Sequence, residues 1–177
     1  MTMKTITLRL WSVFAALTMS ALLLAPLTGD AVAQQKLLKE QLVGDWTLVS
    51  VVNIRPDGTK FDPFDGKAKG MLFFASAGQF SWQVIRSDIP KFASNNRLQG
   101  TADEFKAVAQ GINSYFGLYS LDDSGKTLIQ HVKISSFANF NDTDRKWTIT
   151  LTGDELTLAS QVAASGGANE LKWKRIK

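Results

Sequence analysis

The sequence predicts an all-β protein, an eight-stranded antiparallel barrel with one α-helix between its third and fourth strands. Two observations carry this prediction. Short segments that alternate apolar and polar residues recur along the chain, with turn-forming residues between them, and one segment instead shows helical spacing. Closure of eight strands removes the exposed edges of the sheet, which favours a barrel. An open sheet folded over the helix is the alternative architecture.

The first three strands follow a brief helical turn predicted over 36–43. Strand 46–54 comes first, then a loop over 59–68, and then a hairpin of strands 70–75 and 79–86 around a tight Ser-Ala-Gly turn. Alternation along the first strand predicts one face made of Trp46, Leu48, Ser50, Val52 and Ile54.

The predicted helix begins at Thr101, after an irregular segment over 87–100. Thr101 and Glu104 form the Thr-x-x-Glu pattern of a capping box, and apolar residues at helical spacing continue to Ile112. A glycine-rich stretch over 163–169 reads as a flexible connection. The remaining strands are predicted at 115–121, 126–134, 146–151, 155–160 and 170–176.

The N-terminus is predicted to be a signal peptide over residues 1–33, which leaves a single domain over 34–177. Lys4 and Arg9 precede an apolar run, and small residues occupy the −3 and −1 positions of a cleavage site after Ala33. The alternative is a membrane anchor, but the run is at the short limit for spanning a bilayer. We therefore expect a periplasmic or secreted protein with no integral membrane segment after cleavage.

Composition excludes several kinds of site. The chain has no cysteine, which rules out disulfides, thiolate catalysis and cysteine-bound zinc, and His131 is its single histidine. The loop over 139–144 is rich in oxygen ligands but lacks the glycine and distal glutamate of a calcium loop. The net charge of +4 is scattered, unlike a nucleic-acid-binding patch. We expect no metal, no cofactor and no nucleic-acid partner.

Gly44-Asp45-Trp46, at the start of the first strand, resembles the G-x-W signature of lipocalins. In that family the tryptophan closes one end of the barrel, and an arginine near the last strand packs over its ring. The resemblance implies structural roles for Gly44, Trp46 and Arg175, and a cation–π contact between the last two is physically sensible.

The wider pattern resembles the bacterial and fungal lipocalin-like domain family across residues 42–176. The segments that carry it, in order, are 42–50, 63–64 with Gly70, 78–81, 86–90, 100–104, 115–119, 131–132 and 153–158. The resemblance implies a small barrel but imports no mechanism. By analogy of fold with lipocalins, it implies a small hydrophobic ligand.

Five residues are candidate ligand-binding residues: Arg86, His131, Tyr115, Tyr119 and Trp82. Arg86 is in phase with Trp82 along its strand, so it either holds a ligand carboxylate or forms an ion pair with Asp88. Tyr115 and Tyr119 share a face around a glycine, an arrangement that suits either a ligand with a polar end or a close backbone crossing. His131 is either a hydrogen-bond donor or acid/base group inside the barrel, or an ordinary surface histidine.

Three functions are compatible with these features. The first is an exported carrier that binds a small, largely apolar molecule in the barrel. The second is a small-molecule enzyme, an isomerase or hydrolase, in which His131 acts as acid or base, although no catalytic motif supports it. The third is a non-catalytic envelope interaction module whose barrel interior is filled by side chains. Ligand identity and oligomeric state are beyond what the sequence predicts.

Overall fold

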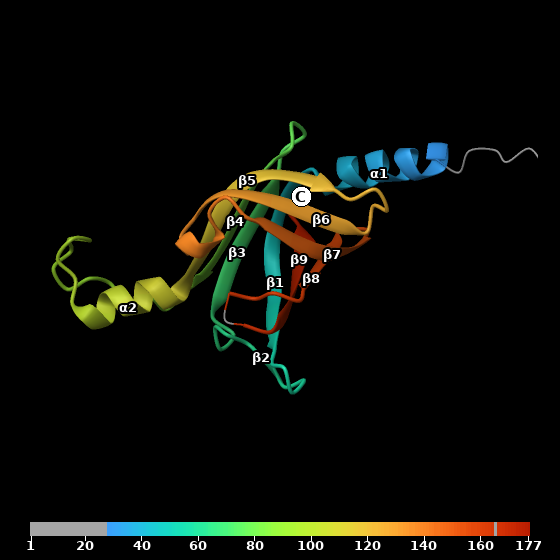
Figure 1. Cartoon of the computed structure of the whole chain (residues 1–177). Coiled ribbons are helices and arrows are strands. Elements are labelled where there is room, and N and C mark those ends of the chain that lie inside the picture. Colours follow the sequence, from blue (N-terminus) through green and yellow to red (C-terminus); the bar gives the residue numbers. More distant parts are fainter. Residues whose placement is uncertain (1–27, 165) are drawn as a thin grey trace, which may run out of the picture.

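The computed structural model describes residues 28–164 and 166–177, and it shows a closed antiparallel barrel (Figure 1). β1 pairs with β3, each strand from β3 to β8 pairs with the next, and β9 pairs with β1 to close the wall. A two-residue strand, β2, pairs with the last two residues of β1. The strands are β1 (Gly44–Ile54), β2 (Lys60–Phe61), β3 (Ala68–Phe74), β4 (Gln79–Arg86), β5 (Ile112–Leu121), β6 (Thr127–Ser135), β7 (Asp144–Thr152), β8 (Glu155–Ser160) and β9 (Ala168–Arg175).

The eight-stranded barrel is thus confirmed, but the predicted placement of one helix between strands 3 and 4 needs correction. The described chain has an α-helix before β1, α1 (Thr28–Leu42), and another between β4 and β5, α2 (Ala102–Gly111). A 3₁₀ turn, η1 (Ala138–Phe140), precedes β7. Because β2 forms within the predicted loop 59–68, α2 now follows the fourth strand in chain order. Its predicted capping box at Thr101 and Glu104 is present.

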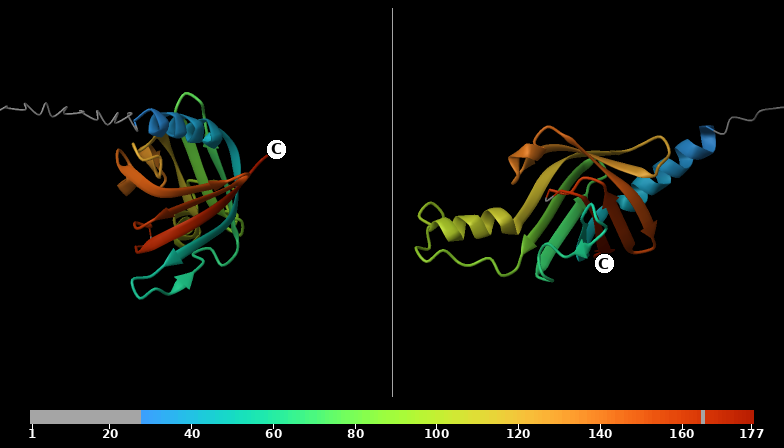
Figure 2. Two further views of the ribbon diagram at one scale, coloured as in Figure 1. Left: turned by 90° about the vertical axis from the view of Figure 1, so that its right-hand side faces the viewer. Right: turned by 60° about the horizontal axis from the view of Figure 1, so that its bottom comes forward.

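Helix α1 replaces the brief helical turn predicted over 36–43, and tertiary contacts hold its second half, from Gln35 to Leu42, against the barrel. It lies across one end of the barrel (Figure 2). The Gln35 side chain donates hydrogen bonds to the carbonyls of Leu121 and Asp122, and Leu42 is fully buried. The apolar residues of α1 do not follow a helical repeat, so packing, rather than pattern, sets its length. Residues 1–27 of the predicted signal peptide lie outside the described residues.

The barrel is closed at the α1 end by Trp46. Its ring is fully buried, and its indole N–H donates to the carbonyl of Leu42 at 3.0 Å. The Arg175 guanidinium lies 4.2 Å from the centre of the Trp46 ring and also donates to the carbonyls of Val43 and Gln41. Gly44 has a φ of +126°, and a Cβ there would lie 3.0 Å from the Arg175 guanidinium. These contacts join α1, β1 and the end of β9.

A β-bulge in β1 changes which of its residues face the interior. The pairing of β1 with β9 shifts between Leu48 and Ser50, so strict alternation breaks there. Trp46 is buried before the bulge, whereas Val51 and Asn53 are buried after it. The predicted single face through Ser50, Val52 and Ile54 is therefore wrong in its second half, because the extra residue turns the later side chains over.

The two ends of the barrel differ in how the strands are connected. Tight turns join β3 to β4, β5 to β6, and β7 to β8 at the α1 end. All of the longer connections lie at the opposite end, which we call the open end: 55–67, 87–111, 136–143 and 161–167. Helix α2 and the loop before it project away from the barrel here (Figures 1 and 2). Among the described helices, none has the length and apolarity needed to cross a membrane.

We predict that Arg175→Met lowers the free energy of unfolding by about 2–4 kcal/mol, because it removes a cation–π contact and two charge-assisted hydrogen bonds. Chemical denaturation followed by tryptophan fluorescence measures this change. Lys177→Met is the matched control, since Lys177 is exposed and pairs only with Asp154. Equal effects of the two substitutions would contradict a structural role for Arg175.

Candidate functional site

The open end of the barrel contains a cavity of about 470 Å³, which we call the mouth cavity. All four open-end connections, or the strand ends beside them, contribute side chains to it. Most of these side chains are apolar, and three asparagines, one each from β1, β5 and β9, lie among them. The lining residues are Val51, Asn53, Phe61, Pro63, Phe64, Val84, Ala109, Gln110, Ile112, Asn113, Phe137, Ala163, Ala164, Asn169 and Leu171.

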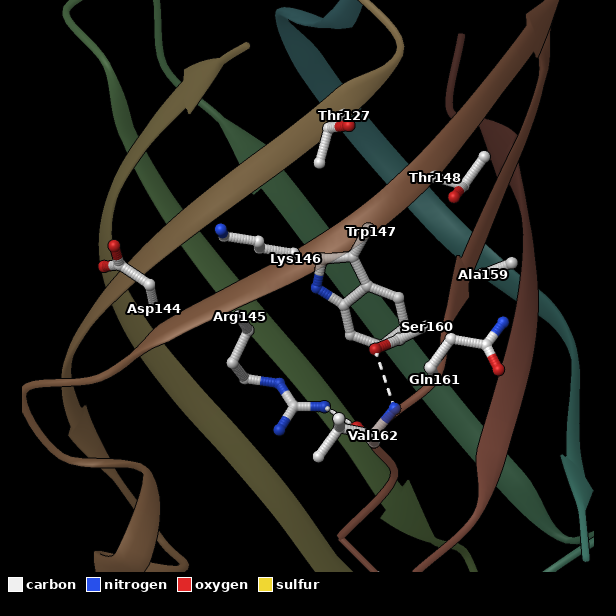
Figure 3. Close-up of a pocket in the computed structure, with 10 residues that line it drawn as sticks. All are labelled: Thr127, Asp144, Arg145, Lys146, Trp147, Thr148, Ala159, Ser160, Gln161 and Val162. Carbon is white, nitrogen blue, oxygen red and sulfur yellow. Dashed lines mark hydrogen bonds between the residues drawn. The ribbon is translucent and has the colours of Figure 1, made fainter. Parts of the chain in front are cut away.

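A second cavity, of about 340 Å³, opens through the wall beside β7, and we call it the wall slot (Figure 3). It forms because β7 changes partner along its length: Asp144–Thr148 pairs with β6, whereas Thr148–Thr152 pairs with β8. Beyond the Thr148–Ala159 pair, β8 and β7 therefore separate. The lining residues are Thr127, Asp144, Arg145, Lys146, Trp147, Thr148, Ala159, Ser160, Gln161 and Val162.

Aromatic side chains fill the centre of the barrel. Trp82 stacks on Tyr115 at 5.3 Å and on Trp147 at 5.1 Å, and it meets Trp173 edge to face at 4.9 Å. All four side chains are buried. The interior next to the mouth cavity is therefore packed with rings, and the predicted ligand-binding residues Trp82 and Tyr115 belong to this packing.

Tyr119 and Gly117 are both in close contact with other parts of the barrel wall. Tyr119 is buried near the α1 end, where its hydroxyl donates to the carbonyl of Ala75 and its ring packs against Phe74. Burial raises the pKa of Tyr119 above its usual value. A Cβ on Gly117 would collide with the backbone carbonyl of His131, so the glycine serves a close crossing of β5 and β6 rather than a gap between the tyrosines.

Arg86 lies at the rim, at the end of β4, and is held by acidic side chains. Its guanidinium donates to Asp88 at 2.8 Å and to Asp65 at 3.1 Å, and Lys67 also contacts Asp88 at 2.8 Å. Hydrogen bonds from Arg86 and then Lys67 hold the pKa of Asp88 well below its usual value. Of the two alternatives for Arg86, the structure shows the ion pair with Asp88.

His131 lies on the outer face of β6, since its neighbours Gln130 and Val132 are the buried ones. One ring nitrogen lies 2.7 Å from the Asp144 carboxylate, and the other lies 3.0 Å from the Ser120 hydroxyl. This order matches a serine–histidine–aspartate relay. Ser120 itself sits within the β5–β6 ladder, opposite Ile129. The arrangement links three strands across the outer wall.

The sequence analysis missed two buried polar residues, Gln130 and Arg145. The Gln130 side-chain oxygen accepts hydrogen bonds from the Trp147 indole at 2.8 Å and from the Tyr115 hydroxyl at 3.2 Å. Arg145 donates to the carbonyl of Val162 at 3.0 Å, and its guanidinium lies 4.0 Å from the centre of the Phe140 ring. Burial raises the pKa of Tyr115, although the nearby Arg145 charge opposes the shift.

The position of Arg145 could have been found from alternation along β7. Arg145 is in phase with the buried Trp147, but the predicted strand began at residue 146 and left it in a loop. Neither of the two cavities is lined by any of the five predicted ligand-binding residues, Arg86, His131, Tyr115, Tyr119 and Trp82. Their proposed contact with a ligand stays a prediction.

Comparison with known proteins finds one family. A family model described as a lipocalin-like domain matches residues 43–176. No curated protein matches the chain. Among solved structures, a lipocalin-like protein from Bacteroides uniformis is similar at 17% identity and a TM-score of 0.43, covering 76% of this chain and 98% of that one. A redesigned beta barrel, b11L5F_LGL, is similar at 12% identity and a TM-score of 0.43, covering 79% and 96%.

We predict that Asp88→Asn lowers the melting temperature at pH 7, and that this difference shrinks as the pH falls. Because the pKa of Asp88 is depressed in the folded protein, its ionised form stabilises the fold above the unfolded pKa of about 4, and that stability is lost as pH falls through the folded pKa. Calorimetry from pH 7 to pH 2.5 measures the trend. Asp123→Asn, in an exposed turn, is the control. A difference independent of pH would contradict the ion-pair interpretation.

Proposed function

This chain belongs to the lipocalin-like domain family, and we propose that it is an exported protein that binds a small, largely apolar molecule in the mouth cavity. The observation that carries the proposal is the cavity of about 470 Å³ at the one end of the barrel where every long connection gathers. Its volume falls within the usual range of small-molecule sites.

The chemistry of the mouth cavity supports an apolar ligand with a few polar atoms. Side chains such as Phe61, Phe64 and Leu171 supply apolar surface. Within the described residues, the buried side-chain oxygens of Asn113 and Asn169 have no hydrogen-bond partner. A ligand that presents donors to these oxygens and an apolar body to the rings would satisfy both parts of the site.

The asymmetry of the barrel also supports this site. Trp46, Arg175 and α1 close the opposite end, and the aromatic packing around Trp82 fills the centre. The mouth cavity therefore opens to solvent on one side and is closed on the other by the aromatic packing. A ligand could enter and leave through that one opening.

We also propose export through the leader over residues 1–33, with a periplasmic or secreted mature chain. Among the side chains of α1 that the structure describes, Gln35, Leu38, Lys39 and Leu42 contact the barrel. All four follow the proposed cleavage point after Ala33, so cleavage leaves the closed end of the barrel covered. The positively charged start, the apolar run and the small residues before that point support the proposal.

We predict that Ala109→Trp, which places an indole on an α2 residue that lines the mouth cavity, weakens binding of the uncharged fluorescent probe N-phenyl-1-naphthylamine by about tenfold or more through lost space and apolar contact. Fluorescence titration measures the affinity. Ala102→Trp, at the exposed start of the same helix, is the matched control and should bind the probe as the unmodified protein does. Equal affinities for all three proteins, or no binding to the unmodified protein, would exclude the mouth as the ligand site.

We predict that the chain expressed in a Gram-negative host is recovered outside the cytoplasm with Gln34 as its first residue. Intact-mass measurement of the fractionated protein identifies the new N-terminus. Ala33→Arg, which replaces the small residue at the cleavage position, should leave the precursor uncleaved. An uncut chain that stays in the cytoplasm would contradict the proposed export.

A further inference from the structure

We propose that the wall slot is a second binding site, specific for a small organic acid whose carboxylate is bound by Arg145. This inference goes beyond the proposed mouth site, because the two cavities share no lining residue. The one connection that borders both is the segment after β8, where Val162 faces the slot and Ala163 faces the mouth.

The first observation is a buried positive charge that has no acidic partner. Arg145 is only 7% exposed, and the buried polar residues of the described chain are otherwise Asn53, Gln130, Ser160 and Asn169, with no aspartate or glutamate among them. The ion pairs of Arg86 and Arg175 show that arginines elsewhere in this protein do pair with carboxylates. A buried cation without a counter-ion destabilises a fold, and a bound carboxylate would supply that counter-ion.

The second observation is an unsatisfied hydrogen-bond donor on Gln130, the residue that pairs with Arg145 across β6 and β7. The Gln130 oxygen accepts from both Trp147 and Tyr115, which fixes the amide orientation and turns its nitrogen away from them. That nitrogen and the Arg145 Nε are buried and, within the described residues, have no hydrogen-bond partner. Two unsatisfied donors, one of them on a cation, match an anion that brings only acceptors.

The third observation is that the slot gives a ligand access to Arg145. Arg145, Trp147 and Ser160 line it, and the side chains of Arg145 and Trp147 extend to the same side of β7 (Figure 3). The wall is open here because β7 and β8 no longer pair beyond Thr148 and Ala159. One terminal nitrogen of Arg145 donates to the carbonyl of Val162, whereas the Nε–H of Arg145 has no acceptor within the described residues.

The shape of the guanidinium and the size of the slot define the ligand class. A guanidinium binds a planar carboxylate through two parallel hydrogen bonds, and this geometry favours a carboxylate over a neutral amide. The Trp147 ring provides an apolar surface beside it, and the slot of about 340 Å³ admits only a small body. The geometry therefore points to a small aromatic or apolar acid.

The test uses 2-naphthoate and its neutral counterpart 2-naphthamide as probes with the purified full-length protein. The arginine Nε–H resonances are recorded by NMR, and that of Arg145 is identified by its absence from Arg145→Met. We expect 2-naphthoate to shift this resonance and to bind about tenfold or more tightly than 2-naphthamide, because only the acid forms a charge-assisted pair. No shift of the Arg145 resonance, or equal affinity for the two probes, would overturn the proposal.

Variants separate a binding role from a structural one. Arg145→Met should bind 2-naphthoate about tenfold or more weakly, and Arg145→Lys should lie in between, because lysine keeps the charge without the planar fork. Lys174→Met, which removes an exposed outward cation of β9, is the matched control for net charge. An Arg145→Met variant that binds 2-naphthoate as tightly as the unmodified protein does would overturn the proposal.

Inorganic phosphate distinguishes an organic acid from a general oxyanion. If phosphate at equal concentration leaves bound 2-naphthoate in place, the apolar body of the acid contributes to recognition, as we propose. If phosphate displaces it, the slot binds oxyanions without regard to their body, and the organic-acid assignment fails. The uncharged probe of the mouth cavity gives an independent readout, so failure at one site does not decide the other.

Discussion

Pairing of β1 with β9 is the constraint on which the rest of this structure depends. It joins the first and last strands of the barrel, and it turns a curled sheet into a wall with an inside. At the α1 end of this seam, Arg175 reaches across to the carbonyl of Val43, 132 residues earlier in the chain, and covers the Trp46 ring. Arg175 also contacts the carbonyl of Gln41 in α1, so the same side chain joins the barrel seam to the helix that covers this end. The bulge in β1 lies on the same seam and sets which later residues face inward.

Closure also explains why four aromatic side chains, Trp82, Tyr115, Trp147 and Trp173, pack together at the centre of the barrel. Within a wall of eight strands, inward side chains meet at the centre, and four large rings occupy that space. Within the described residues, two spaces for a ligand lie where this packing ends: at the open end, among long connections, and beside β7, where two strands separate. Both cavities are lined partly by polar atoms that rings cannot satisfy. The polar atoms of the barrel interior thus mark its candidate sites better than the rings do.

The alternation of inward and outward side chains along the strands explains where the predicted polar residues lie. His131 lies between two buried residues, so it faces outward, where it links Ser120 and Asp144 instead of entering the barrel. Arg86 keeps the phase of Trp82 but sits at the strand end, where Asp65 and Asp88 reach it first. Arg145 differs from both. The sequence predicts it in a loop, whereas β7 begins one residue before it, so its side chain is buried in phase with Trp147. Because the predicted strand starts at residue 146 and β7 starts at Asp144, the sequence does not predict that Arg145 is buried.

The sequence by itself determined the eight barrel strands, the tight turn between β3 and β4, and the capping box of α2, because each depends on residues close together in the chain. It also showed the family likeness at Gly44, Trp46 and Arg175. Only the tertiary structure decided the length of α1, the bulge in β1, the exit of β7 from its pairing with β8, and the isolation of Arg145 from carboxylates. Each of these depends on which distant segments lie side by side, and alternation within one strand carries no information about its neighbours. For that reason the architecture was predictable from the sequence, whereas the positions of its two cavities were not.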